Sequence, residues 1–559
     1  MLETAEKKSK KQYKPIHESS RSWPVVRLNK HRKEFIEEVI EKTIESFYKN
    51  ASSDTEIIEE LEATLYREKL RMRANPWRVD PKDDHEFWEG MKKKLLDLTT
   101  GKVQNNEYTE KDLLRSIVTR YANEIAGKFK PSKYRLARSI VKNGFSRLLN
   151  ATRVKGLFAI FKNDYTLNDK IHIYGKTDLL RELAMKGTVV MVPTHFSNLD
   201  SVLIGWIIHT LGLPPFIYGA GLNLFNIKIF AYFMNSVGAY KVDRRKKNKL
   251  YIETLKMYSS QAIQMGAHSL FFPGGTRSRS GRIEKKLKRG LLGTTIEAQR
   301  SLLMKEEVSP RKIFIVPVTI NYNFVLEAPV LINDYLKETG QERFYTEQDE
   351  YSTSYRIVKF LIKFFTKDSI ISVSIGKPMD VLGNYVNDQG ESLDKNDNHI
   401  RIKDYFTSNG KIVEDLQREE EYTRMLSQRI VEEYHRINRV FASHLVAYAA
   451  FNYWRSKFPA LDLYNFLRLP EEELTIDFDE FTQIVNDLRE KIYELKRQDK
   501  IKVAKHLKSD IVEVVKRGIN NVGMYHVNRP LLLNKEGKVI TKSLTNLYFY
   551  HNRLDGYDL

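Results

Sequence analysis

The sequence predicts an α/β fold in the middle of the chain, with a helical region on each side of it. Between about 156 and 385, short β-branched runs alternate with helical stretches, as they do in βαβ units. On both sides of that span, apolar residues recur at the three- and four-residue spacing of helices. With 559 residues, of which 42% are hydrophobic, the chain is long enough for several structural units.

The first two predicted units precede the α/β domain. Residues 1–33 are predicted to form a basic flexible tail, because the opening MLETAEKKSKKQYK is polar and rich in lysine. No apolar run occurs in it, so we expect neither a secretory signal nor a membrane anchor there. Residues 34–155 are predicted to form a helical domain, because segments such as HRKEFIEEVIEKTIESFYK show helical periodicity.

The predicted α/β domain covers residues 156–385. Its rhythm begins just after Lys170, where IHIYG indicates a strand, KTDLLRELAMKG a helix closed by glycine, and TVVMVPTH a buried strand. Further strands are predicted in SLFFPGG, KIFIVPVTINY and ISVSIGKP, with helical stretches between them. The order of these segments predicts βαβ units and a largely parallel sheet.

Two more units are predicted after the α/β domain. Residues 386–402 contain the polar run NDQGESLDKNDNH and are predicted to be a linker. Residues 403–559 return to helical periodicity, as in VEDLQREEEYTRMLSQRIVEEYHRINRVF, and are predicted to form a helical C-terminal region.

One apolar segment suggests contact with a membrane. The stretch from Ser201 to Asn226 carries no formal charge, but prolines and glycines interrupt it too often for an ordinary spanning helix. We therefore expect a helix and a loop that lie in or near a membrane surface without crossing it.

Charge and cysteine usage limit the classes of function. The chain has 92 Lys and Arg against 72 Asp and Glu, and the net charge of +20 favours anionic partners such as lipids, phosphorylated molecules or nucleic acid. It has no cysteine, which excludes disulfides, a thiol nucleophile and cysteine metal sites. No zinc, helix-turn-helix or RNA-recognition motif is present, so we expect no nucleic-acid partner, and no metal site is predicted.

The segment HFSNLD places His195 and Asp200 where a predicted strand runs into a predicted helix. On a regular helix this spacing would point the two side chains apart, so they converge only if His195 precedes the helix and Asp200 lies in its first turn. Ser197 and Asn198 are suitable N-cap residues for that turn. In this geometry Asp200 would orient the imidazole so that its free nitrogen accepts a proton from an alcohol.

A second pair with the same spacing, His399 and Asp404, shows that the spacing alone is weak evidence. It lies in and just after the predicted linker, with no strand before it, and we interpret it as a chance match. A capping or core histidine remains the alternative for His195 until other segments support it.

A glycine- and arginine-rich segment provides that support, from Ser269 to Gly290. Gly274 and Gly275 follow a predicted strand and would let backbone N–H groups approach an anion. Arg277 and Arg279 then supply guanidinium groups that match phosphate. Taken alone, the segment also fits a tight turn followed by a solvated basic face.

Two further segments complete the pattern. In GAYKVDRRKKNK, Arg244 and Arg245 follow a short predicted strand, although a charged turn is the alternative. In IFIVPVTI, Pro317 lies inside a predicted buried strand. Because proline has no N–H to donate, that strand should be bulged or at a sheet edge there.

Taken in chain order, the four segments resemble the four sequence blocks of the glycerolipid acyltransferase family. The blocks correspond to His195 to Asp200, Gly238 to Arg245, Phe272 to Ser278, and Val316 to Val318. The chain length, the helical flanks, the extended RSRSG and the terminal YFYHNRL look more like the long glycerol-3-phosphate acyltransferases than the short lysophosphatidate enzymes.

The resemblance implies a role for each matching residue. His195 would be the general base on the acceptor hydroxyl and Asp200 its orienting partner, while Arg244 and Arg277 would bind the acceptor phosphate. The other positions that it places at the substrate are Gly274, Gly275, Thr276, Ser278 and Pro317. One residue departs from the pattern, because the family usually has glutamate where this chain has Gly274. Glu284 is not at the matching position and is not expected to replace it.

The function implied is acyl transfer from a thioester, either acyl-CoA or acyl carrier protein, to the sn-1 hydroxyl of glycerol 3-phosphate, with no cofactor. One alternative is the same chemistry on 1-acylglycerol 3-phosphate, and another is a membrane-binding scaffold that lost activity with the glutamate. The expected partners are the donor, glycerol 3-phosphate and an anionic membrane surface. The expected location is the cytoplasmic face of a membrane, as a peripheral or monotopic protein.

Overall fold

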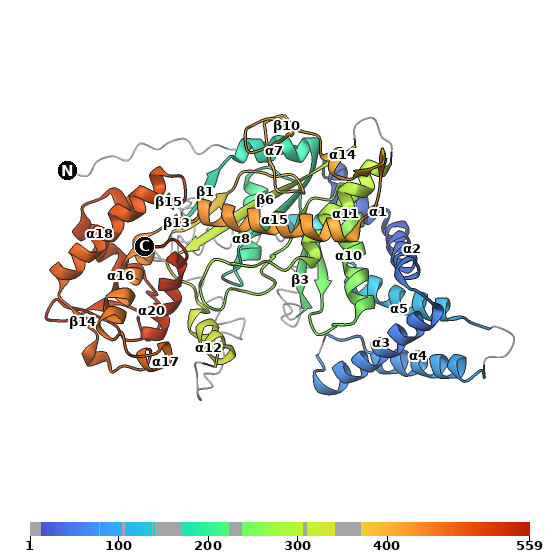
Figure 1. Cartoon of the computed structure of the whole chain (residues 1–559), viewed down its shortest axis with the longest axis horizontal. Coiled ribbons are helices and arrows are strands. Elements are labelled where there is room, and N and C mark those ends of the chain that lie inside the picture. Colours follow the sequence, from blue (N-terminus) through green and yellow to red (C-terminus); the bar gives the residue numbers. More distant parts are fainter. Residues whose placement is uncertain are drawn as a thin grey trace.

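The computed structural model describes residues 13–77, 79–102, 107–136, 138–139, 170–222, 238–305, 310–340 and 370–559. A β-sheet with its covering helices forms the middle of the molecule, and the N-terminal and C-terminal helices lie at opposite ends of the long axis (Figure 1). The fold is therefore mixed α/β, as the sequence predicts.

Among the described residues, seven strands form the central sheet, in the order β1-β7-β6-β2-β5-β3-β4. Five neighbouring strands, from β6 to β4, run parallel to one another. Strand β7 pairs antiparallel with β6, and β1 pairs parallel with β7. The strands are β1 (Ile171–Gly175), β2 (Gly187–Pro193), β3 (Ile217–Gly221), β4 (Ala239–Val242), β5 (Ser269–Leu270), β6 (Lys312–Tyr322) and β7 (Ile371–Ile375).

Both faces of the sheet are covered, as β2 shows. All seven of its residues are buried. Val189 and Met191 join one hydrophobic core, and Val190 and Val192 join another, because successive side chains of a strand point to opposite faces. The helices of this domain are α7 (Thr177–Lys186), α8 (Asp200–Thr210), α10 (Lys249–Gln264), α11 (Gly290–Met304) and α12 (Ala328–Glu338).

Pro317 lies inside the sheet and not at its edge, because β6 pairs with β2 on one side and with β7 on the other. Pairing with the β7 side stops at Val318 and resumes with a bridge between Ile315 and Met379. Three residues, Gly376 to Pro378, therefore face two residues of β6, and this bulge accommodates the missing proline N–H.

The N-terminal helices pack against α10 of the α/β domain. Phe35 contacts Tyr258 and Tyr121 contacts Tyr251, with ring centroids 5.1 and 5.3 Å apart. The elements are η1 (Ser20–Ser22), α1 (Pro24–Lys30), α2 (Arg32–Asn50), α3 (Asp54–Ala74), α4 (Asp84–Thr99) and α5 (Glu110–Ile125).

The prediction of a flexible tail over residues 1–33 is wrong for residues 13–33, while residues 1–12 lie outside the described residues. The Tyr13 hydroxyl is 2.5 Å from the Thr177 hydroxyl, and Val25 and Leu28 are buried. The lysines dominate the composition, but these few apolar side chains are enough to hold the segment on the fold.

The predicted linker at 386–402 is instead a small antiparallel sheet. Its strands are β8 (Tyr385–Val386), β9 (Ser392–Leu393) and β10 (His399–Ile400). The Asn387 side chain accepts from the N–H groups of Gln389 and Glu391, and Asp394 makes the same pair of bonds in the next turn. The polar residues that predicted a linker therefore build two hairpin turns.

The structure describes residues 201–222 of the apolar segment from Ser201 to Asn226, and much of this part packs inside the protein. Leu203, Ile204, Ile207 and Ile208 of α8 are buried in the protein core, and so is most of β3. A segment that packs under other elements needs no charged residues, which accounts for the missing charge in this described part. Within the described part of the chain, no helix is both long enough and apolar enough to cross a bilayer.

The C-terminal region is mostly helical and shares a hydrophobic core with the sheet. The helix α15 (Leu416–Ile437) runs across the middle of the molecule (Figure 1), and its Tyr434 hydroxyl donates to the Val192 carbonyl at 2.7 Å. The other main elements are α16 (Ala442–Lys457), α18 (Phe478–Arg497), α19 (Ile511–Asn521), α20 (Leu544–His551) and η7 (Asn552–Leu554). This region is thus part of the support of the sheet.

Candidate active site

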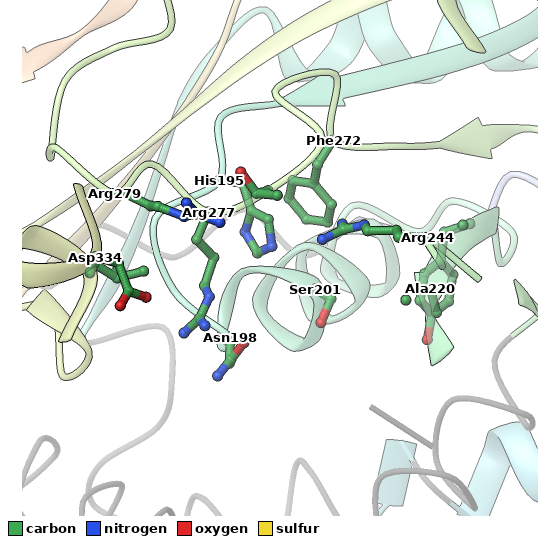
Figure 2. A pocket seen from close by; sticks show the side chains of 14 residues that line it. His195, Asn198, Ser201, Ala220, Arg244, Phe272, Arg277, Arg279 and Asp334 are labelled. Atoms are coloured by element: carbon green, nitrogen blue, oxygen red, sulfur yellow. The ribbon is translucent and has the colours of Figure 1, made fainter. Parts of the chain in front are cut away.

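The predicted site residues follow the carboxyl ends of neighbouring parallel strands. His195 follows β2, Arg244 follows β4, and Phe272 to Arg277 follow β5. The carboxyl ends of parallel strands meet at one edge of a sheet, so the loops converge there. Figure 2 shows His195, Arg244 and Arg277 around one pocket, and its volume is about 200 Å³.

His195 and Asp200 form a hydrogen-bonded pair. His195 Nδ1 lies 2.8 Å from Asp200 Oδ2, and Asp200 is the first residue of α8. The predicted caps are wrong, because the N-cap is Leu199 and makes no side-chain capping bond. Instead the Asp200 carboxylate turns back and accepts the N–H groups of Phe196 and Ser197, at 2.6 and 2.9 Å. These hydrogen bonds hold the turn that contains His195 against the first turn of α8.

Three features fix the state of this pair. Asp200 is fully buried, and its Oδ1 accepts a hydrogen bond of 2.5 Å from the Tyr322 hydroxyl. Burial, followed by the Asp200 charge, raises the pKa of Tyr322, so this hydroxyl stays a donor. The His195 ring stacks on Phe272, with centroids 4.2 Å apart. With Nδ1–H donated to Asp200, Nε2 keeps the lone pair that accepts a proton.

Arginines surround the pocket. Arg244, Arg277 and Arg279 all line it, together with Thr276. Desolvation, followed by repulsion from Arg277, lowers the pKa of Arg244, which reflects how close the two cations lie. A pocket lined with three guanidinium groups beside a histidine is suited to bind a phosphate-bearing alcohol.

The neighbouring Arg245 has a structural role instead. It forms ion pairs with Asp80 and Asp243, and its guanidinium lies 4.0 Å from the centre of the Trp77 ring. It therefore fastens the segment after α3 to the loop after β4. Of the two arginines that the sequence singles out, only Arg244 lines the pocket.

The other predicted substrate positions do not line the pocket: they are Gly274, Gly275, Ser278 and Pro317. Gly275 donates its N–H to the Phe272 carbonyl at 2.9 Å, so this group closes a turn and is not free for an anion. Ser278 donates its N–H to the His195 carbonyl at 2.7 Å, and Pro317 lies within β6. Gly274 lies next to Glu284, as described below.

Sequence reasoning missed Glu327, which holds the site from the loop before α12. Its carboxylate accepts from the Asn198 N–H at 2.9 Å and from the Ser197 hydroxyl at 3.1 Å. It also lies 3.4 Å from Arg277. Glu327 therefore joins the histidine turn to Arg277. No local motif marks it, because its partners are far away in the sequence.

The second pair with the same spacing is not a site. Asp404 pairs with Arg401, and His399 lies 3.4 Å from Glu391, on an exposed surface. Among the described residues, no group of three or more His, Asp or Glu side chains is arranged to hold a metal ion.

Comparisons with known proteins place residues 170–321 in a family model described as Acyltransferase. The chain is 32% identical over 226 residues to a glycerol-3-phosphate acyltransferase of Pseudoalteromonas translucida, which is 40% of this chain and 24% of that protein. It is 34% identical over 188 residues to one of Actinobacillus pleuropneumoniae (33% and 21%), and 30% identical over 231 residues to one of Haemophilus influenzae (41% and 26%). The matched part thus spans about a quarter of these curated relatives.

Proposed function

We propose that this chain, whose α/β domain belongs to the glycerolipid acyltransferase family, transfers an acyl group from a thioester to the sn-1 hydroxyl of glycerol 3-phosphate. The observation that carries the proposal is the His195–Asp200 pair at a pocket lined by Arg244 and Arg277. The donor is acyl-CoA or acyl carrier protein, and no cofactor takes part.

The proposed reaction uses one proton acceptor and two anion-binding groups. Arg244 and Arg277 bind the phosphate and bring the acceptor hydroxyl to His195 Nε2. As Nε2 takes the hydroxyl proton, the oxygen attacks the thioester carbonyl, the C–S bond breaks, and the leaving thiolate takes the proton from His195. The buried Asp200 carboxylate stabilises the imidazolium in between.

Supplying radiolabelled glycerol 3-phosphate and 1-acylglycerol 3-phosphate separately tests the acceptor. Each is mixed with palmitoyl-CoA or with palmitoyl acyl carrier protein. We expect consumption of glycerol 3-phosphate and formation of lysophosphatidate. Consumption of 1-acylglycerol 3-phosphate alone would assign the other acceptor. If neither acceptor is consumed with either donor, the result would support the alternative of an inactive membrane-binding scaffold.

Replacing Arg277 by alanine should raise the acceptor KM about tenfold or more and leave the donor KM nearly unchanged. The variant loses a charge-assisted contact worth about 1.5–3 kcal/mol, and each 1.4 kcal/mol is about tenfold. Initial rates at varied glycerol 3-phosphate measure this. Arg289→Ala is the matched control, because Arg289 is exposed and pairs with Glu420. An unchanged acceptor KM in Arg277→Ala would mean that Arg277 does not bind the phosphate and only forms the ion pair with Glu327.

We also propose that the protein works at the cytoplasmic face of an anionic membrane, held peripherally by its net charge of +20. The described part of the apolar segment is core, so charge is the attachment that remains supported. Binding to phosphatidylglycerol vesicles should exceed binding to phosphatidylcholine vesicles and should fall steeply as salt is raised. Salt-independent binding to both vesicle types would refute attachment by charge.

A further inference from the structure

Gly274 replaces the glutamate of the family pattern, and the structure shows what lies beside it. Its backbone is not in the left-handed region, so a side chain here meets no backbone strain. A Cβ built on Gly274 would lie 2.8 Å from Glu284 Oε1 and 3.2 Å from Glu284 Cγ. The space next to Gly274 is therefore already filled by a carboxyl group from ten residues further along the chain.

The Glu284 carboxyl group lies behind the turn that carries His195. Its Oε1 accepts the His195 backbone N–H at 3.4 Å, and its Oε2 is buried without a hydrogen-bond partner among the described residues. On the other side of the turn, Ser278 donates to the His195 carbonyl. Both backbone groups of His195 are thus held by the segment that follows β5.

We propose that Glu284 supplies the carboxyl group that Gly274 lacks and acts as a positioning residue, fixing the His195 backbone against the loop after β5. It does not line the pocket, so it acts through His195 and not on the substrate. Glycine at 274 is then a requirement of this arrangement, because a glutamate there would meet the Glu284 carboxyl group. The inference rests on the proposed function only for its kinetic readout.

Electrostatics agree with a buried carboxyl group in this place. Burial raises the pKa of Glu284 to about 7, with Asp200 acting in the same direction and Arg553 against it. Tyr434 of α15 also lies close, since the Glu284 charge contributes to raising its pKa. Ionisable groups with perturbed pKa values cluster at functional sites.

A double-mutant cycle tests the exchange of positions. Glu284→Ala should lower kcat about 10-fold to 100-fold, because a shift of about 1 Å in an active-site group can cost about 10²-fold. Gly274→Glu should also lose activity, because two carboxyl groups crowd one space. The combined Gly274→Glu/Glu284→Ala variant should recover kcat to within about 3-fold of the native protein, and such non-additivity marks residues in contact. Lys286→Ala, at a neighbouring exposed position, should have native kcat and KM.

Thermal unfolding of the same variants supplies a readout without turnover. The double variant should be more stable than Gly274→Glu, whether or not the native protein transfers acyl groups. An inactive native protein with this recovery of Tm would refute the proposed function and keep the positional exchange. The inference would be overturned if the double variant had neither a higher Tm nor a higher kcat than the single variants. It would also be overturned if Glu284→Ala kept the native kcat.

Glu284→Gln tests the carboxyl group with little change of shape. The pKa of Glu284 is higher in the folded state than its ordinary 4.5, so its protonated form favours folding. Its contribution to stability is complete below 4.5 and is lost as the pH rises to about 7. The Tm of the native protein relative to Glu284→Gln should therefore fall across this window. A difference in Tm that is constant with pH would contradict the buried, ionising carboxyl group.

Discussion

Replacing His195 by alanine is expected to lower kcat by about 10²-fold to 10⁴-fold and to leave the fold intact, because it removes the proposed general base and little packing. His195 is partly exposed at the pocket, and the structural bonds of its turn come from backbone groups and from Asp200. The acceptor KM should change little, since the phosphate contacts remain. Initial rates at saturating glycerol 3-phosphate measure the effect, and circular dichroism checks the fold.

The chain contains a matched control for this variant. His399 has an aspartate at the same spacing, but it is exposed and lies 3.4 Å from Glu391. His399→Ala should therefore keep native kcat and KM. A folded His195→Ala protein with more than about a tenth of the native kcat would remove His195 as the general base, because such catalysis is worth at least about 10²-fold.

The local parts of the site could be predicted from the sequence. Only four residues lie between His195 and Asp200, so the turn and the first helical residue determine how the two side chains meet, and both are encoded within one short segment. The convergence of Arg244 and Arg277 on that pair follows from parallel strands, whose carboxyl ends share one edge. It is the family resemblance, and not the arrangement of the strands, that predicts both arginines at the substrate from the sequence.

Contacts between distant segments could not be predicted in this way. Tyr322 reaches the histidine turn from β6, and Glu327 reaches it from the loop after β6. Arg553 of η7 lies 4.1 Å from the centre of the Phe196 ring. Periodicity shows which face of an element is buried but not which element covers it. For the same reason, the absence of charge after Asp200 did not reveal that much of the described part of this segment packs in the protein core.

The position of Glu284 shows a related limit of motif matching. A motif aligns residues along the chain, whereas the space beside Gly274 can be filled from any segment that folds back to it. The segment after β5 does so within ten residues, because it wraps around the histidine turn and bonds to both sides of it. A missing motif residue is therefore weak evidence for lost activity when its space remains filled by the same chemical group.

Replacing Asp200 by asparagine should lower kcat by about 10²-fold to 10⁴-fold, mainly by removing negative charge. The carboxylate accepts the N–H groups of Phe196 and Ser197 and the His195 ring on Oδ2, and the Tyr322 hydroxyl on Oδ1. An asparagine oxygen in the Oδ2 position keeps the first three bonds, and its amide group can donate to the Tyr322 oxygen. The turn should survive, but the imidazolium loses its buried counter-charge.

Two further variants separate this effect from a loss of structure. Tyr322→Phe removes one hydrogen bond to Asp200 and leaves the charge, so its kcat should lie between the native protein and Asp200→Asn. The double variant His195→Ala/Asp200→Asn should be no slower than His195→Ala alone, because Asp200 acts through the imidazole that is already absent. The native protein and the four variants are compared at saturating acceptor and donor, with Tm measured in parallel. Losses that multiply in the double variant would show that Asp200 acts independently of His195 and would refute the pair as the catalytic unit.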